Sequence, residues 1–395
     1  MKAGSLVAAG VVVVSIAGLA ACSDDSDEAA SNSKTVQVKI TNDGCTATPG
    51  KVNAGAITFE ITNTDATAVS EVELIKDNRI LAERENIAPG IAAAPFSHNL
   101  GGGTYTLYCP GATNERTEFT VVGETTQATG AVPDLLRDEA GEYKTYVNEQ
   151  VDLLVGATKV LVDAVHANNL QQAKDAYPKA RPFYERIEPV AGSFCDDGST
   201  DCSENAAVNL DAAIDAREDS VPPGGTWQGF HVLEKQLFSA GNLDGMGPVA
   251  DTLMRNVNLL KTLVSKPDFT FAPADIINGA GDLLDEVSTT KLTGEEERYA
   301  HIDILDMQAN IEGSEQAFGI VRPALQQIDP QLTQQLVDAF AKVDELIDGF
   351  RDPSQPGGFK LFDQVADADK RKMAEAIIAV KDPLAQAGGK IAAAG

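Results

Sequence analysis

The chain has 395 residues, a formal net charge of −28 at pH 7 and a sequence pI near 4.4. An acidic surface of this size repels nucleic acid and attracts cations, so we expect no nucleic-acid partner, although negative charge by itself also keeps proteins soluble. Hydrophobic residues make up 43% of the chain and aromatic residues 6%, as in a soluble globular protein. Beyond the N-terminus, no apolar run is long enough to span a membrane.

The N-terminal segment, residues 1–21, has the features of a bacterial lipoprotein signal peptide. A short positive start precedes an apolar run from Val7 to Ala20, which is too short for a stable membrane-spanning helix. The run ends in Leu-Ala-Ala directly before Cys22, the position that receives the lipid; the alternative is a plain secretory signal with an incidental cysteine. We therefore expect an extracytoplasmic protein anchored to the cell membrane by a lipid on Cys22, on the periplasmic side or the cell surface. Residues 22–34 predict an acidic, flexible tether.

Residues 35–123 alternate apolar and polar side chains, a pattern that indicates strands. The segments 36–40, 56–62, 72–75, 104–109 and 117–122 show this period of two, and Asn-Asp-Gly, Pro-Gly and Gly-Gly-Gly sequences separate them. About seven short strands in about ninety residues predict an all-β sandwich of immunoglobulin or cupredoxin size.

The period changes after a polar linker at residues 124–132. Tyr143, Val147, Val151, Leu154 and Leu161 form one apolar stripe with helical spacing. Similar stripes occupy residues 249–263, 300–325 and 332–350, with Pro/Gly-rich breaks between them. Residues 133–395 therefore predict an all-α helix bundle as a second domain.

The densest group of candidate metal ligands lies between residues 184 and 234 of the bundle. Glu185 and Glu188 are three residues apart, so they share one helix face, and His231 and Glu234 repeat this spacing. Asp215 lies on a separate segment between the two pairs. Helix bundles build metal sites from such pairs, and carboxylates with one imidazole suit iron, zinc or manganese better than copper(I). The alternative is that these residues are solvated charges on acidic helices.

The cysteines that remain after lipidation form two pairs. Cys45 and Cys109 lie near opposite ends of the β domain, where they form either a structural disulfide or a thiolate–carboxylate metal site with an acid such as Glu71. A type-one copper site is excluded, because no His or Met follows Cys109 at a suitable distance. Cys195 and Cys202 enclose a polar six-residue loop and predict a local disulfide.

Two other functions are compatible with parts of the sequence. The His-x-x-Glu pair is similar to half of a zinc-peptidase motif, but residue 235 is Lys where a second His would be needed, so peptidase activity is disfavoured. Haem binding would need an axial ligand in an apolar pocket, and the carboxylates around His231 disfavour it. His98 and His301 have no evident ligand partner in the sequence.

Five segments in order resemble the EfeO family of iron uptake proteins. They are residues 83–90 (ERENIAPG), 184–189 (YERIEP), 214–219 (IDARED), 229–235 (GFHVLEK) and 308–313 (QANIEG). The resemblance covers nearly all of the chain that follows the signal peptide. It implies a cupredoxin-like sandwich followed by an imelysin-like helical domain, the latter historically classed with peptidases.

The resemblance also implies a function and assigns residues to it. It implies a binding protein, not an enzyme, that captures ferrous or ferric iron outside the membrane and passes it to an iron permease, with a haem-peroxidase-like partner; zinc or copper are further candidate ions. The implied metal ligands of the helical domain are Glu185, Glu188, Asp215, His231 and Glu234, and those of a second site in the β domain are Cys45, Glu71 and Cys109.

The chain departs from the family pattern in two places. The stretch with Cys195 and Cys202 looks like an insertion between Glu188 and Asp215, and the lipid anchor replaces a free periplasmic state. Further ligands are expected from residues 294–299 (GEEERY), where the sequence does not distinguish among three adjacent acids.

Overall fold

The computed structural model describes residues 30–69, 71–76, 79–84, 87, 89–90, 95–124, 129–195, 209–221 and 224–395. The expected signal peptide, most of the tether, Cys22 and Cys202 lie outside these residues. Part of the expected linker does too, and the first helix begins at residue 131. Within the described part of the chain, no helix is both long enough and apolar enough to cross a membrane.

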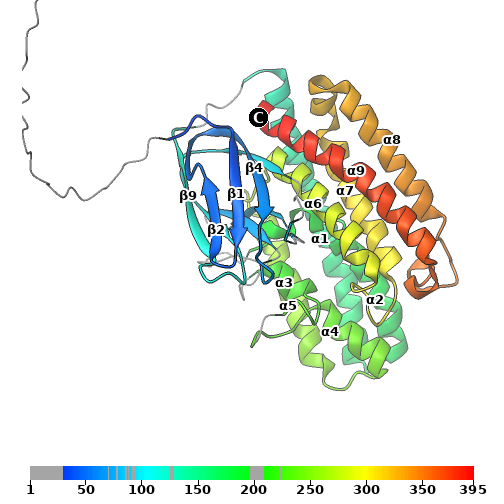
Figure 1. Ribbon diagram of the computed structural model, residues 1–395. Coiled ribbons are helices and arrows are strands. Elements are labelled where there is room, and N and C mark those ends of the chain that lie inside the picture. The colour runs from blue at the N-terminus through cyan, green and yellow to red at the C-terminus, as the bar shows by residue number, and fades with distance from the viewer. Residues whose placement is uncertain are drawn as a thin grey trace, which may run out of the picture.

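The alternating segments fold into a sandwich of two sheets (Figure 1). One sheet has the order β2-β1-β4-β7 and the other β3-β9-β8-β5-β6; β1 pairs with β4 in parallel, with Val38 opposite Ile61. The inward side chains, such as Phe59, Phe96 and Phe119, pack as a buried aromatic cluster. The described strands are β1 (Thr35–Thr41), β2 (Gly44–Thr48), β3 (Lys51–Asn53), β4 (Gly55–Asn63), β5 (Val72–Lys76), β6 (Arg79–Arg84), β7 (Phe96–Leu100), β8 (Gly103–Tyr108) and β9 (Arg116–Val122).

A disulfide joins the two sheets. Cys45 on β2 is bonded to Cys109, which follows β8, with their Cα atoms 6.2 Å apart. This corrects the expected metal site of Cys45, Glu71 and Cys109, because two sulfur atoms bonded to each other are not available as thiolate ligands. The disulfide alternative is therefore the one that the structure contains.

The helical half packs around one continuous apolar core. The predicted stripe of α1, from Tyr143 to Leu161, is buried in it. The helices are α1 (Ala131–His166), α2 (Leu170–Glu185), α3 (Leu210–Asp215), α4 (Phe230–Glu234), α5 (Met246–Val264), α6 (Pro273–Thr289), α7 (Asp303–Ile328), α8 (Pro330–Asp348) and α9 (Asp367–Ala394). Short 3₁₀ turns include η1 (Glu188–Ser193) and η3 (Lys291–Thr293), and a π-helical turn, η2 (Lys235–Ala240), continues α4. The predicted fold class, a β-sandwich followed by a helix bundle, is confirmed.

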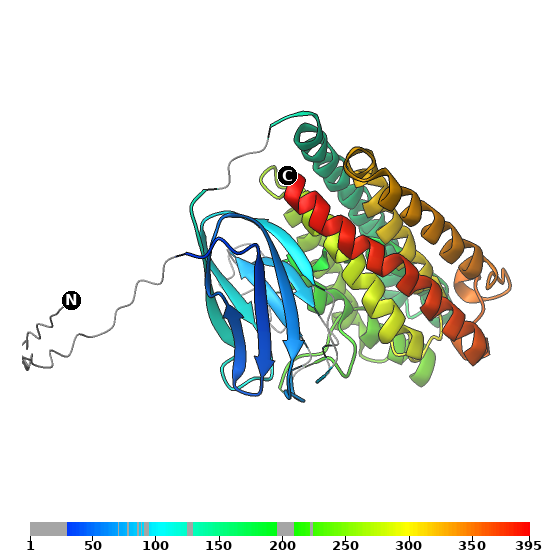
Figure 2. The ribbon, with the colours of Figure 1, turned by 45° about the horizontal axis from the view of Figure 1, so that its top comes forward.

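The sandwich lies against α6 and α9 of the bundle (Figure 2). Asn278 on α6 donates to the carbonyl of Ser97 (2.6 Å), and Arg84 forms a buried ion pair with Asp282. His98, which had no evident partner in the sequence, contacts Asp275 across the same interface (Nδ1–Oδ1 2.6 Å). Beside this interface, a cleft of about 380 Å³ is lined by β6 of the sandwich and by residues of the bundle.

Candidate metal centre

The acids and the histidine that the sequence singled out come together inside the bundle, and Glu188 and Asp215 among them line this cleft. They come from segments far apart in the chain: the end of α2, the start of η1, the end of α3, and α4. Two further acids, Glu296 and Glu297, come from the loop between η3 and α7. Donor atoms fall into three groups, each within 4.8 Å, in the described part of the chain: Asp215, His231 and Glu296; Glu185, Glu188 and Asp215; and His231, Glu234 and Glu297.

Gly229 brings the end of α3 against the start of α4. Its φ is +95°, and a Cβ atom at this position would lie 2.2 Å from the carbonyl oxygen of Ile214. Only glycine allows this backbone conformation together with this close approach. The contact holds Asp215 and His231 next to each other, although fifteen intervening residues separate them.

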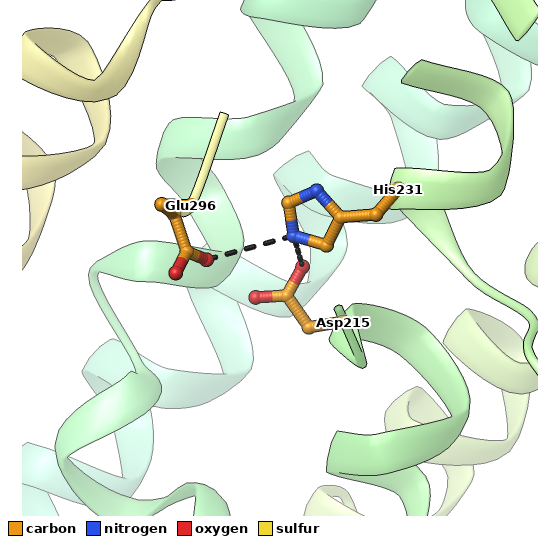
Figure 3. A group of neighbouring side chains, drawn as sticks. All are labelled: Asp215, His231 and Glu296. Atoms are coloured by element: carbon orange, nitrogen blue, oxygen red, sulfur yellow. Dashed lines mark ion pairs between the residues drawn. The ribbon is translucent and has the colours of Figure 1, made fainter. Parts of the chain in front are cut away.

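Asp215, His231 and Glu296 point toward one another (Figure 3). The His231 Nε2 atom lies 3.4 Å from Asp215 Oδ1 and 3.5 Å from Glu296 Oε1. His231 and Glu296 are buried, the Asp215 side chain is 8% exposed, and the Nε2 atom has no hydrogen-bond partner among the described residues. A buried polar atom without a partner is rare, and here it faces two carboxylates. This arrangement matches the donor set of a metal ion that accepts oxygen and imidazole ligands.

Glu234 orients the histidine from the other side. Its Oε2 atom is 3.1 Å from His231 Nδ1, and its Oε1 atom accepts hydrogen bonds from the backbone amides of Tyr299 and Ala300 (2.6 and 2.8 Å). In metal sites, a carboxylate on the distal ring nitrogen fixes the tautomer and raises the basicity of the ligand. The geometry therefore gives Glu234 a positioning role, and it leaves this carboxylate poorly placed to act as a base on water.

Glu185 and Glu188 form an adjoining pocket that cationic and amide donors fill. Lys291 Nζ donates to Glu188 (2.8 and 2.9 Å) and to Glu185 (3.3 Å). Asn310 Nδ2 donates to the same two carboxylates (2.9 and 2.6 Å). These two acids thus lie beside the Asp215–His231–Glu296 group, but their oxygens already have protein donors.

Arg181 contacts acids from more than one of these donor groups. Its guanidinium is fully buried and pairs with Glu185 and Asp215, and it reaches Glu296 at 3.2 Å. A buried charge of this kind needs several partners to offset its desolvation. Arg181 therefore holds the acidic side chains in place when no metal ion is bound.

The neighbouring cations and burial shift the pKa values of these acids in different directions. Burial alone would raise the pKa of Asp215, but Arg181 and His231 lower it below its usual value. Burial also opposes ionisation of Glu296, yet Lys291, Arg217 and His231 hold its pKa well below the usual range. The pKa of Glu188 is raised well above its usual value, because burial outweighs the attraction of Lys291. Asp215 and Glu296 therefore offer ionised oxygens at neutral pH.

His231 carries a proton in this state. Burial lowers the pKa of His231, but the carboxylates of Asp215, Glu234 and Glu296 outweigh that effect and raise it well above its usual value. An imidazole binds a metal only in its neutral form. A metal ion must therefore displace the proton on Nε2, and the two carboxylates that stabilise the proton would also stabilise the ion.

Several of these residues were not singled out from the sequence. Among residues 294–299, the structure buries Glu296 and Glu297 and leaves Glu295 partly exposed. Arg181 had a signal that was missed: it lies between Tyr177 and Tyr184 on the buried stripe of α2. Lys291 had no such signal, since a lone lysine between helices is usually solvated.

The remaining expected site residue is Cys195. It is disulfide-bonded, and its expected partner Cys202 lies outside the described residues, so their pairing stays a prediction.

The cleft gives the centre a route to solvent. Glu188, Asp215 and Glu296 line it from the bundle, and Ile80, Glu83 and Arg84 line it from the sandwich. The candidate ligands thus lie at a junction of both domains.

Comparisons with known proteins agree with this architecture. Residues 140–387 match the imelysin family, and residues 10–121 match the cupredoxin-like domain family. The chain is 37% identical over 360 residues to the iron uptake system component EfeO of Escherichia coli O157:H7, and the match covers 90% of each chain. The EfeO proteins of Escherichia coli K12 and Shigella flexneri are 36% identical over the same coverage.

The chain belongs to the EfeO family. The chain also has a structural likeness to a protein described as an iron-regulated protein A precursor from Parabacteroides distasonis, with a TM-score of 0.50 and 15% identity. That likeness covers 67% of this chain and 97% of the other, and at this identity it shows the fold alone. In this EfeO-family chain, the predicted segments 184–189, 214–219 and 229–235 are the ones that carry the candidate centre.

Proposed function

We propose that this protein binds iron outside the cytoplasmic membrane as a component of an EfeO-type iron uptake system. The proposed ligands are Asp215, His231 and Glu296, with Glu234 as the residue that orients His231. Glu185 and Glu188 form the adjoining second position. The observation that carries the proposal is the buried His231 Nε2 atom, which has no hydrogen-bond partner among the described residues and faces two carboxylates.

The chemistry of this donor set supports iron as the cargo. Two carboxylates and one imidazole suit ferrous or ferric iron, and they also accept zinc or manganese. Soft donors that would favour copper(I) are absent from the three donor groups of the described residues. The names of the 36–37% identical relatives supply the link to iron uptake.

Metal analysis and an anaerobic titration with Fe(II) test this proposal. We expect the purified wild-type protein to bind iron, and Asp215→Asn to weaken binding more than about 100-fold, because losing a direct ligand exceeds the 10- to 100-fold effect of an outer partner. His166→Gln is the control, since His166 is an exposed histidine paired with Asp251. Unchanged affinity in Asp215→Asn would reject the proposed centre.

The family resemblance supports the proposed partners, and the Leu-Ala-Ala sequence before Cys22 supports the proposed anchor. We propose that a lipid on Cys22 anchors the protein to the cell membrane and that it passes iron to a membrane permease, together with a haem-peroxidase-like partner. The lipid anchor is tested by fractionation: Cys22→Ser protein should leave the membrane fraction after a salt wash. Its persistence in that fraction would refute the anchor.

A hydrolase function has less support. The imelysin match suggests it by family history, and the His-x-x-Glu pair would have to supply a base. Glu234 is occupied by His231 and by the backbone amides of Tyr299 and Ala300, which argues against that role.

A further inference from the structure

Lys291 is a fully buried lysine in the middle of the acidic cluster. It lies on η3, between α6 and α7. Its ammonium contacts both oxygens of Glu188 at 2.8 and 2.9 Å, Glu185 at 3.3 Å and Glu296 at 3.7 Å. Because a buried ammonium is stable only when several partners offset its desolvation, Lys291 is fixed at this position.

The position that Lys291 occupies is one that a metal ion could take. Oxygens of Glu185, Glu188 and Asp215 lie within 4.8 Å of one another, which is close enough to share a small cation. Helix bundles use such glutamates for centres with two ions, and paired ions in proteins lie about 3.5–4 Å apart. Asp215 belongs to this group and to the group with His231, so the two positions are adjacent.

The two positions differ in what already fills them. In the Glu185–Glu188 pocket, the Lys291 ammonium supplies a compact positive charge and Asn310 supplies further donors. Beside it, the His231 Nε2 atom lacks a hydrogen-bond partner among the residues that the structure describes. The first position thus contains the Lys291 ammonium. At the second, Arg181 also reaches Asp215 and Glu296, and the position differs by an imidazole nitrogen without a hydrogen-bond partner.

We propose that Lys291 takes the place of a second metal ion and limits the cluster to one ion, bound at Asp215, His231 and Glu296. This inference rests on the proposed function. With Lys291 present, Glu185 and Glu188 act as partners of the ammonium and not as metal ligands. Without it, the same two carboxylates lose their ammonium partner and keep only Asn310 and Arg181 as donors, which leaves room for a second cation.

The test is the number of ions per chain. Wild-type protein and Lys291→Met are titrated anaerobically with Fe(II), and bound iron is measured after gel filtration. We expect about one ion per wild-type chain and about two per Lys291→Met chain. Lys235→Met is the matched control and should keep one ion, because Lys235 is a partly exposed lysine that pairs with Glu218.

The possible results separate this inference from the proposed function. Two ions in the wild type, or one ion in Lys291→Met, would overturn the role of Lys291 while leaving iron binding intact. No ion in the wild type would overturn both.

A second variant keeps the test decisive if Lys291→Met does not fold. Glu188→Gln keeps the lysine and removes one of its carboxylate partners, a largely buried side chain that is 14% exposed. If Glu188 serves Lys291, the affinity for the single ion should change by less than about threefold. A loss of more than about tenfold would identify Glu188 as a direct ligand and overturn the inference.

Discussion

His231 is the residue on which the proposed chemistry depends, and its two ring nitrogens have different tasks. Nδ1 faces Glu234, and Nε2 faces Asp215 and Glu296. The backbone amides of Tyr299 and Ala300 fix Glu234 in turn. The ring is thus held before any ion arrives, which reduces the ordering that binding requires.

Glu234→Gln tests this positioning role. The glutamine oxygen can still accept from the backbone, but its amide donates to Nδ1 and places the imidazole proton on Nε2, where the ion should bind. We expect iron affinity to fall by about 10- to 100-fold with the fold unchanged, measured by anaerobic competition titration and circular dichroism. Glu218→Gln, at an exposed acid of the nearby loop, is the control of equal charge change.

The iron affinity of the protein should depend on pH, because His231 must lose a proton when iron binds. Its pKa is raised well above the usual value by three carboxylates that outweigh burial, so the metal-free histidine is protonated at neutral pH. Binding must release this proton, and affinity should fall as pH falls. Calorimetry in buffers of different ionisation enthalpy should show His231→Gln releasing about one proton fewer than the wild type at pH 7. Equal proton release in both proteins would contradict this.

Among the secondary-structure elements, α3 and α4 show how a short contact can set a site. Each has only one or two turns, so neither is stable by itself. The approach of Gly229 to Ile214 couples them and brings Asp215 to His231. The contact between the end of α3 and the start of α4 therefore determines the geometry of the centre more than the two helices themselves do.

Gly229→Ala should disrupt this junction. The positive φ by itself destabilises a non-glycine residue by about 1–3 kcal/mol, and the overlap with Ile214 adds to it. Gly224→Ala in the same loop is the control, because its φ is also positive, +86°, but a Cβ would meet no atom within 4 Å. Denaturant unfolding should show a larger loss for Gly229→Ala, together with weaker iron binding. Equal effects would mean that the contact is unimportant.

The sequence predicts these elements better than it predicts their charges. Alternation and helical stripes identify the sandwich and the bundle because burial imposes those periods on apolar residues. The spacing of His231 and Glu234 likewise predicts a shared face. Arg181 and Lys291 were not predicted, because a buried cation leaves no periodic pattern in the sequence. Its partners are acids that the fold brings together from distant segments. For the same reason, the sequence does not show that Glu296 is the candidate ligand among the three adjacent glutamates.

On the scale of the whole molecule, the sandwich supplies a wall of the cleft. Its own expected metal site is replaced by the Cys45–Cys109 disulfide, which stabilises the two sheets. Strand β6 then contributes Ile80, Glu83 and Arg84 to the face opposite the candidate ligands. The packing of the two domains against each other therefore decides how accessible the centre is to solvent and to any partner.

The ion pair between Arg84 and Asp282 holds this wall in place. Arg84 and Asp282 are both largely buried, and burial raises the pKa of Asp282 to about 6 even though Arg84 lowers it. Removing one partner of a buried pair typically costs about 3–5 kcal/mol, because the other charge is left without compensation. Arg84→Met should therefore loosen the sandwich from the bundle at pH 7. The expected sign is faster hydrogen exchange in β6 and α6, whereas Arg137→Met, at an exposed arginine of α1, should have no such effect.

The pH dependence of this effect follows from Asp282. Its pKa is about 6 in the folded state and 3.8 in the unfolded state, so its ionisation lowers stability as the pH rises from about 3.8 to about 6. At pH 5 the carboxyl is mostly neutral in both proteins, and the difference between Arg84→Met and the wild type should shrink. A difference that stays constant between pH 5 and 7 would show that Arg84 contributes through packing and not through its charge.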